Sequence, residues 1–137
     1  MARQPSARKL VTDRARDMID DAFAAVKAVG LALPDVEAAT RYDGSPLLKV
    51  GGCFMAGLAT HSSAEPGTLV VRASLEDRDG FLEDAPDTYY VTDYYRPYPL
   101  VLVRLSRIDR EALRDLLSVS RRLTLEKARR PTNRARR

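Results

Sequence analysis

The chain has 137 residues, of which 45% are hydrophobic and 31% are charged, and it contains a single cysteine and a single histidine. This length suits one domain that buries about two-thirds of its unfolded surface and folds without covalent cross-links. One cysteine, Cys53, excludes an internal disulfide and a Cys-x-x-Cys metal or redox motif. No apolar run approaches the ~20 residues of a membrane-spanning helix.

The net charge of +4 is unevenly distributed along the chain. Residues 1–12 carry three cations and no anion, and residues 126–137 carry six cations and Glu126. The intervening residues 13–125 carry 14 cations and 18 anions, so the basic character belongs to the two ends. Basic ends of this kind attract any polyanion weakly and in a salt-dependent way.

These composition shifts predict the domain organisation. We expect a basic N-terminal extension over residues 1–11, one domain over residues 12–125 and a disordered basic tail over residues 126–137. The N-terminal cations are not followed by an apolar segment, so we expect no secretory signal and a cytoplasmic protein.

The first periodic element is a helix. Thr12 is a suitable N-cap, and Gly30 offers the left-handed conformation that ends helices. Apolar residues recur between them at three- and four-residue spacing: Ala15, Met18, Ile19, Ala22, Phe23, Val26 and Val29. The next segment, LALPDVEAAT, predicts at most one helical turn begun by Pro34.

The period then changes to that of strands. Gly51-Gly52 predicts a two-residue hairpin turn, and Pro66-Gly67 suits the centre of a type II turn. The expected strands are Pro46–Val50, Cys53–Ala59, Thr68–Ala73, Thr88–Thr92 and Leu100–Leu105. Two prolines in DYYRPYP exclude regular pairing there.

Two further helices complete the pattern. LEDRDGFLEDAPD predicts a short helix stopped before Pro86, and Asp109 is the N-cap of a final helix with Ile108 and Leu113 at the spacing of a hydrophobic staple. We therefore expect an α+β fold, with an antiparallel sheet of about five strands and the N-terminal and C-terminal helices packed on one face.

Two long segments carry a resemblance to a known family. They read LPDVEAATRYDGSPLLKVGGCFMAGLATHSSAEPGTLVVRA and TYYVTDYYRPYPLVLVRLSRIDREALRDLL. In order, they contain a leucine-proline turn, a lysine-bearing strand, a hairpin, an ATH loop, the YY and YP pairs and a VLVRL strand. The chain thus resembles the MmcQ/YjbR-like family of small bacterial proteins over about residues 12–123.

This resemblance implies a CyaY-like α+β sandwich, also described as double-wing DNA-binding-like, and it implies DNA binding without catalytic residues to carry over. The chain departs from the family at SVSRR in the final helix, where relatives commonly have a tryptophan. Arg121 occupies that usually aromatic position. We expect either a frayed, exposed helix end or a changed surface role there.

Catalysis and metal binding have little support from the residues. His61 lies near Ser62 and Ser63, but sequence neighbours rarely form a triad and no GxSxG elbow is present. Cys53 lies at the start of a strand beside an aromatic residue, which favours an inert thiol. No His, Cys and carboxylate set has metal-ligand spacing. We expect a monomeric, non-enzymatic protein without metal or cofactor.

Strand alternation predicts which side chains leave the helix-covered face. The residues expected to face the helices are Phe54, Ala56, Leu58, Leu69, Val71, Val101, Val103 and Leu105. The residues expected on the opposite face are Met55, Val70, Arg72, Leu100, Leu102 and Arg104. With Lys49 nearby, that face would combine cations with apolar and tyrosine side chains.

Two functions follow from this face. The first is DNA binding, in which cations contact phosphates, tyrosines stack on bases and the basic tails add weak, salt-dependent affinity. Its candidate residues are Lys49, Arg72, Arg96, Arg104, Tyr94, Tyr95 and Tyr98. The second is a protein-interaction or adaptor domain that uses the same surface. In a third interpretation the DYYRPYP loop covers the face, and Asp87, Asp93 or tyrosine hydroxyls pair the arginines.

Overall fold

The computed structural model describes residues 23–129 of the chain. Thr12, the N-terminal extension and residues 130–137 therefore lie outside the described residues. Residues 23–31 are helical. The other elements, in chain order, are β1 (Val36–Thr40), β2 (Pro46–Val50), β3 (Cys53–Leu58), β4 (Thr68–Arg72), α2 (Leu75–Asp84), β5 (Tyr89–Tyr90), β6 (Leu100–Arg104) and α3 (Arg110–Arg129).

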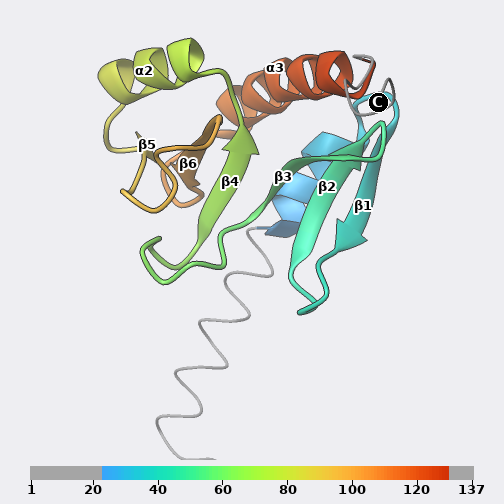
Figure 1. Cartoon of the computed structure of the whole chain (residues 1–137), viewed down its shortest axis with the longest axis horizontal. Coiled ribbons are helices and arrows are strands. Elements are labelled where there is room, and N and C mark those ends of the chain that lie inside the picture. Colours follow the sequence, from blue (N-terminus) through green and yellow to red (C-terminus); the bar gives the residue numbers. More distant parts are fainter. Residues whose placement is uncertain (1–22, 130–137) are drawn as a thin grey trace, which may run out of the picture.

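The strands form one antiparallel sheet in the order β1-β2-β3-β4-β6-β5 (Figure 1). The expected α+β class with a sheet of about five strands is confirmed, and the sheet has six. Helix α3 and helical residues 23–31 contribute to the same core on one face. That core includes Phe23, Val26, Val29, Leu48, Val50, Met55, Ala56, Leu69, Val71, Val101, Val103, Leu113, Leu116 and Leu117.

The predicted turns are confirmed by backbone geometry. Gly51 and Gly52 have φ of 59° and 78°, and Gly67 has φ of 76°, conformations that glycine adopts without a Cβ clash. Gly51 has a second role, because a Cβ built on it would lie 3.0 Å from the Cβ of Ala128. The hairpin can therefore approach the last turn of α3 closely.

The segment expected to form one helical turn at Pro34 is instead a strand. Residues Val36–Thr40 pair along the whole of β2, from Val36 opposite Val50 to Thr40 opposite Pro46. Asp35 has φ of 64° and redirects the chain into this strand. Local propensity in LALPDVEAAT favours neither state strongly, and pairing with β2 decides it.

Arg121, at the usually aromatic position of α3, holds the turn before β1. Its Nε donates a hydrogen bond of 2.6 Å to the carbonyl oxygen of Pro34, and its guanidinium lies 3.9 Å from the carboxylate of Asp35. The side chain is half-buried. The position is therefore neither frayed nor free, and it joins α3 to the start of the sheet.

The predicted faces of β3 are wrong at Phe54 and Met55. Lys49 pairs with Phe54 but Leu48 pairs with Ala56, so Met55 is an extra residue in a β-bulge. This insertion reverses the alternation: Met55 is fully buried in the main core, and Phe54 packs on the opposite face. Ser120 of α3 donates a 3.3 Å hydrogen bond to the Met55 carbonyl at the bulge.

The final helix begins as expected and extends further than expected. The Asp109 side chain accepts a 2.7 Å hydrogen bond from the backbone N–H of Ala112, and Ile108 and Leu113 both join the core. The helix continues to Arg129, so residues 126–129 of the predicted disordered tail are helical. The strand expected over Thr88–Thr92 shortens to Tyr89–Tyr90. No described helix is long and apolar enough to span a membrane.

Candidate functional site

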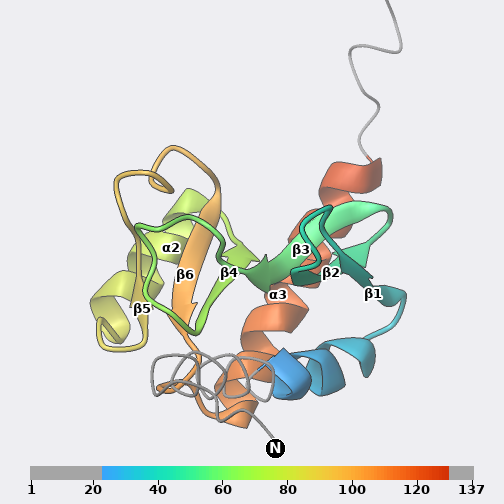
Figure 2. The ribbon, with the colours of Figure 1, turned by 90° about the horizontal axis from the view of Figure 1, so that it is seen from below.

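The face of the sheet opposite the helices is partly covered by two loops. Residues 59–67 and 91–99 lie over the β4, β5 and β6 part of the sheet, and Figure 2 shows the first of these loops passing across β5 and β6. Beneath them a second apolar cluster buries Val70, Tyr95 and Leu102. The interpretation in which the DYYRPYP loop covers the face therefore holds for this half of the sheet.

A buried arginine of α2 fixes the 91–99 loop in place. The Arg78 side chain is only 7% exposed, and its Nη1 donates hydrogen bonds to the carbonyls of Arg96, Tyr98 and Leu100 at 3.1, 3.0 and 3.4 Å. Its Nε is buried without a hydrogen-bond partner among the described residues. No sequence signal predicted this role, because Arg78 stands among acidic residues in a helix with little apolar periodicity.

Arg104 is engaged within the fold and is not available for phosphate. Its Nε lies 3.1 Å from both carboxylate oxygens of Glu65, and its Nη2 lies 2.7 Å from Oε2. Its Nη1 donates to the carbonyls of Pro86 and Asp87, and its guanidinium lies 4.2 Å from the centroid of the Tyr90 ring. The expected partners were carboxylates of Asp87 or Asp93 or tyrosine hydroxyls, whereas the carboxylate that pairs with it belongs to the 59–67 loop.

This pairing also shifts the pKa values of both side chains. Hydrogen bonding to Arg104 lowers the pKa of Glu65 below its ordinary value, and the same hydrogen bond raises the pKa of Arg104. Because Glu65 is exposed, the bond positions the loop more than it stabilises the protein.

The loop tyrosines separate into one buried ring and two exposed rings. Tyr95 is buried in the second cluster, with 7% of its surface exposed. The expectation that its ring stacks on a base is therefore wrong. Tyr94 and Tyr98 are 50% and 51% exposed, and their ring centroids lie 6.5 Å apart. His61 stacks on Tyr94 with centroids 3.5 Å apart and ring planes 8° apart. We name His61, Tyr94 and Tyr98 the aromatic platform.

His61 has contacts that hold a ring rather than activate a nucleophile. Its Nδ1 accepts a 3.0 Å hydrogen bond from the backbone N–H of Ser63 and lies 2.9 Å from the Ser63 hydroxyl. That hydroxyl also lies 2.9 Å from the Thr92 hydroxyl, and the His61 backbone N–H donates to the Tyr95 hydroxyl. No carboxylate of residues 23–129 orients the imidazole. Since Nδ1 is an acceptor, the neutral ring carries its proton on Nε2.

A row of side chains runs across the same face from β2 to β6. Lys49 on β2 lies opposite Phe54 on β3, and Arg72 on β4 donates a 2.9 Å hydrogen bond from Nε to the Phe54 carbonyl. Arg72 lies opposite Leu100 on β6. Lys49 and Arg72 thus each neighbour Phe54, which was itself expected on the other face.

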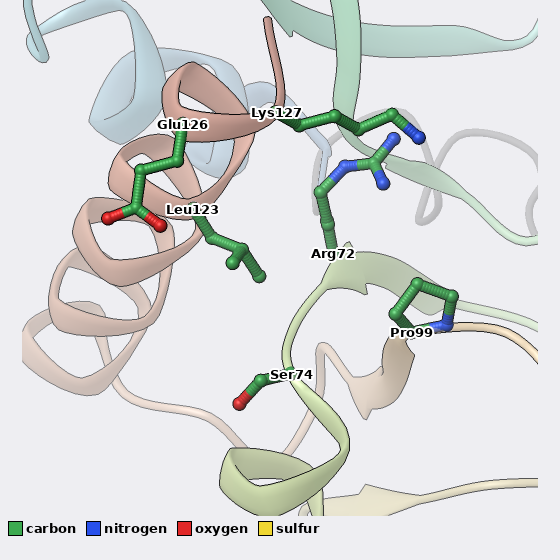
Figure 3. A pocket seen from close by; sticks show the side chains of 6 residues that line it. All are labelled: Arg72, Ser74, Pro99, Leu123, Glu126 and Lys127. Atoms are coloured by element: carbon green, nitrogen blue, oxygen red, sulfur yellow. The ribbon is translucent and has the colours of Figure 1, made fainter. Parts of the chain in front are cut away.

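Two neighbouring cavities, each of about 250 Å³, adjoin this row. We name them together the Arg72 groove. Arg72, Pro99 and Lys127 line both cavities; the others are Phe54, Ser74, Tyr98, Leu100, Leu123 and Glu126. Figure 3 shows the Arg72 and Lys127 side chains extending toward the same opening, while the Glu126 carboxylate points away.

Lys127 is the cation that the sequence did not identify. It was assigned to the tail because EKARRPTNRARR contains no large apolar residue. The helical last turn of α3 carries it to the rim of the groove instead. Within residues 23–129, no carboxylate lies within ion-pair distance of Arg72 or Lys127.

The remaining candidates lie outside the groove. Arg96 is exposed and its Nε lies 3.6 Å from the Asp93 carboxylate. Cys53 is a free, partly buried thiol. No group of three or more His, Cys, Asp or Glu side chains among residues 23–129 is arranged to hold a metal ion.

Tyr98 joins the two features of this face. Tyr98 lines the Arg72 groove, and its ring lies next to the ring of Tyr94. Through Tyr98, the groove lined by Arg72 and Lys127 adjoins the stacked rings of Tyr94 and His61. Comparisons with protein-family models, characterised proteins and solved structures find no match to this chain.

Proposed function

We propose that the protein is a non-enzymatic DNA-binding module that contacts phosphates through the Arg72 groove, and that it is a member of the MmcQ/YjbR-like family. The observation that carries the DNA proposal is the position of Arg72. Its Nε is fixed by the Phe54 carbonyl, and the end of its guanidinium lines a solvent-open groove together with Lys127.

The chemistry of the groove suits a phosphate. A guanidinium presents several N–H donors in a fixed plane, and an ammonium adds a compact charge beside it. Because no described carboxylate neutralises either cation, an anion that enters the groove does not first have to break an ion pair. Lys49 extends the cationic row by one strand.

The remaining surface suits the rest of a nucleotide. The groove is lined with Pro99, Leu100 and Phe54, and the adjoining tyrosines are half exposed. Arginine, lysine and exposed aromatic rings are the groups that nucleic-acid-binding proteins use for backbone contact and base stacking. The four arginines of residues 130–137 follow directly from the helix that carries Lys127 and would add sequence-independent affinity.

The test is DNA binding by the full chain at several salt concentrations. We expect Arg72→Gln with Lys127→Gln to weaken binding and to make it less dependent on salt. Each phosphate contact contributes about 0.9 to the slope of log K against log salt for duplex, and about 0.7 for a single strand. The double variant should therefore lose roughly 1.8 or 1.4 of that slope.

A matched control removes the same number of positive charges from a distant part of the protein. Arg110 and Arg114 are exposed near the N-terminal end of α3, about 25 and 20 Å along the helix from Lys127 at ~1.5 Å per residue. We expect Arg110→Gln with Arg114→Gln to leave the slope almost unchanged. If both double variants lower the affinity equally, net charge and not the groove governs binding, and the proposal is wrong.

A further variant separates the tail from the groove. Replacement of the four arginines at positions 130, 134, 136 and 137 by glutamine should lower affinity for every DNA to a similar degree. If this variant abolishes binding and the groove variant has no effect, the basic tail alone is responsible.

A further inference from the structure

We propose that this surface selects single-stranded nucleic acid, with an unpaired base stacked on Tyr94 and its neighbouring phosphate held by Arg72 and Lys127. The inference rests on the proposed function and adds the class of ligand. It is carried by the aromatic platform, which lies beside the groove and is independent of the cations.

The platform is built before any ligand arrives. His61 covers one face of Tyr94 and the ring of Tyr95 meets Tyr94 edge-on, with centroids 5.0 Å apart and planes 85° apart. Hydrogen bonds between Ser63 and Thr92 and between His61 and Tyr95 tie the two supporting loops together. Half of the Tyr94 side chain is nevertheless exposed. An aromatic ring held rigidly and left exposed loses little conformational freedom when a base stacks on it.

Stacking of this kind requires an unpaired base. In a duplex the base faces are already stacked on each other, so a protein ring reaches them only by opening the helix. Single-strand-binding surfaces combine a cationic track with rings on which bases stack, whatever the sequence. The arrangement of Lys127, Arg72, Tyr98 and Tyr94 along one surface has both parts.

The charge and shape of the described residues do not favour a duplex. Residues 23–129 carry fourteen Lys and Arg and fifteen Asp and Glu, so they do not form the broadly basic body typical of duplex binders. The cavities of about 250 Å³ are recessed between the 91–99 loop and α3. Duplex readers usually insert a projecting helix or ribbon into a groove of the DNA.

The Nε2 proton of His61 supplies a hydrogen-bond donor beside the platform. Nδ1 is occupied by Ser63, and no hydrogen bond to Nε2 is formed by residues 23–129. Since His61 lies against Tyr94, this donor is next to the stacking position and can meet a base acceptor. The site would thus offer a flat ring, one donor and two phosphate-binding cations.

The experiment uses the full chain and one labelled oligonucleotide of about 12 nucleotides, of mixed sequence, free or annealed to its complement. The affinity for an RNA strand of the same sequence shows whether the surface prefers single-stranded DNA or single-stranded RNA. We expect the free strand to bind roughly ten-fold or more tightly than the duplex, and Tyr94→Ala to remove most of that advantage. Tyr94→Phe, which keeps the ring, should retain it.

A control and a direct signal accompany the affinities. Tyr42→Ala removes a fully exposed tyrosine in the β1–β2 turn and should change neither affinity. His61 is the only histidine of the chain, so its imidazole signals are unique in an NMR spectrum. They should shift when the free strand is added and stay in place when the duplex is added. Circular dichroism confirms that Tyr94→Ala is folded.

The outcomes separate the two proposals. If the duplex binds as tightly as the free strand, or if Tyr94→Ala weakens both equally, the single-strand inference is wrong. DNA binding through the groove still stands in that case, provided that Arg72→Gln with Lys127→Gln weakens binding. If the groove variant changes nothing, the proposed function fails and this inference fails with it.

Discussion

Replacement of Arg78 by methionine should release the 91–99 loop and destabilise the protein by about 2 kcal/mol. Methionine approximates the volume of the arginine stem, so the change removes the donors and the charge without leaving a large cavity. Nη1 of Arg78 donates to the carbonyls of Arg96 and Tyr98 at 3.1 and 3.0 Å, and more weakly to Leu100 at 3.4 Å.

Two opposing effects determine the magnitude. Hydrogen bonds from a charged donor contribute about 1.5 kcal/mol each at the low end, so the two short ones are worth about 3 kcal/mol. The variant also removes a buried charge whose Nε has no partner among the described residues, and this removal stabilises the protein by about 1 kcal/mol. The net loss is about 2 kcal/mol, which lowers the melting temperature by roughly 8 °C at ~4 °C per kcal/mol.

Urea denaturation followed by far-UV circular dichroism measures the loss, and amide hydrogen exchange locates it. The amides of Tyr95 and Tyr98, both bonded within the loop, should exchange faster in the variant. Arg122→Met is the matched control, because Arg122 is exposed on α3, and it should change stability by less than about 0.5 kcal/mol. A similarly small effect of Arg78→Met, with unchanged exchange in the loop, would refute the reasoning.

Two further predictions concern glycines and pH. Gly57→Ala should cost about 1–3 kcal/mol, because its Cβ would lie 2.9 Å from the Cβ of Leu47, whereas Gly80→Ala, with open space around it in α2, should gain about 0.5–1 kcal/mol. Urea denaturation checks both, and shifts of the same sign would contradict the packing argument. Arg104 lowers the pKa of Glu65, so the stability lost in Glu65→Gln should be constant above the unfolded pKa and should shrink as pH falls below about 4.3. Denaturation of both proteins from pH 3 to 7 measures this difference, and a loss that grows toward low pH would have the wrong sign.

The candidate site was only partly accessible to sequence reasoning. Lys49, Arg72, Tyr94 and Tyr98 were identified because alternation and the two loop prolines place them away from the helix-covered core. Arg104 satisfies the same alternation but meets Glu65, a residue 39 positions away. No local pattern encodes a pair of that separation.

The same limit explains the residues that were missed or misassigned. Tyr95 differs from Tyr94 only by its side of the loop, and the sheet beneath decides which ring is buried. Lys127 belongs to a segment with the composition of a disordered tail, yet α3 continues through it. Propensity summed over so few residues does not locate the end of a helix.

The sequence by itself determined the features of the backbone that depend on a few neighbouring residues. Gly51-Gly52 specifies its hairpin because only glycine adopts two successive positive φ angles without cost. Asp109 specifies the start of α3 because its side chain bonds an N–H three residues away. The apolar periods of 3.6 and 2 residues likewise specify the α+β class.

Tertiary structure decided the features in which distant segments compete or cooperate. The strand at Val36–Thr40 forms because β2 offers a partner, and the bulge at Met55 is stabilised by Ser120 of α3. Arg78 is buried because its guanidinium donates hydrogen bonds to two carbonyls of the later 91–99 loop and to that of Leu100 in β6. In each case the stabilising free energy comes from contacts between groups far apart in the chain. The short-range pattern of residues therefore does not predict the outcome.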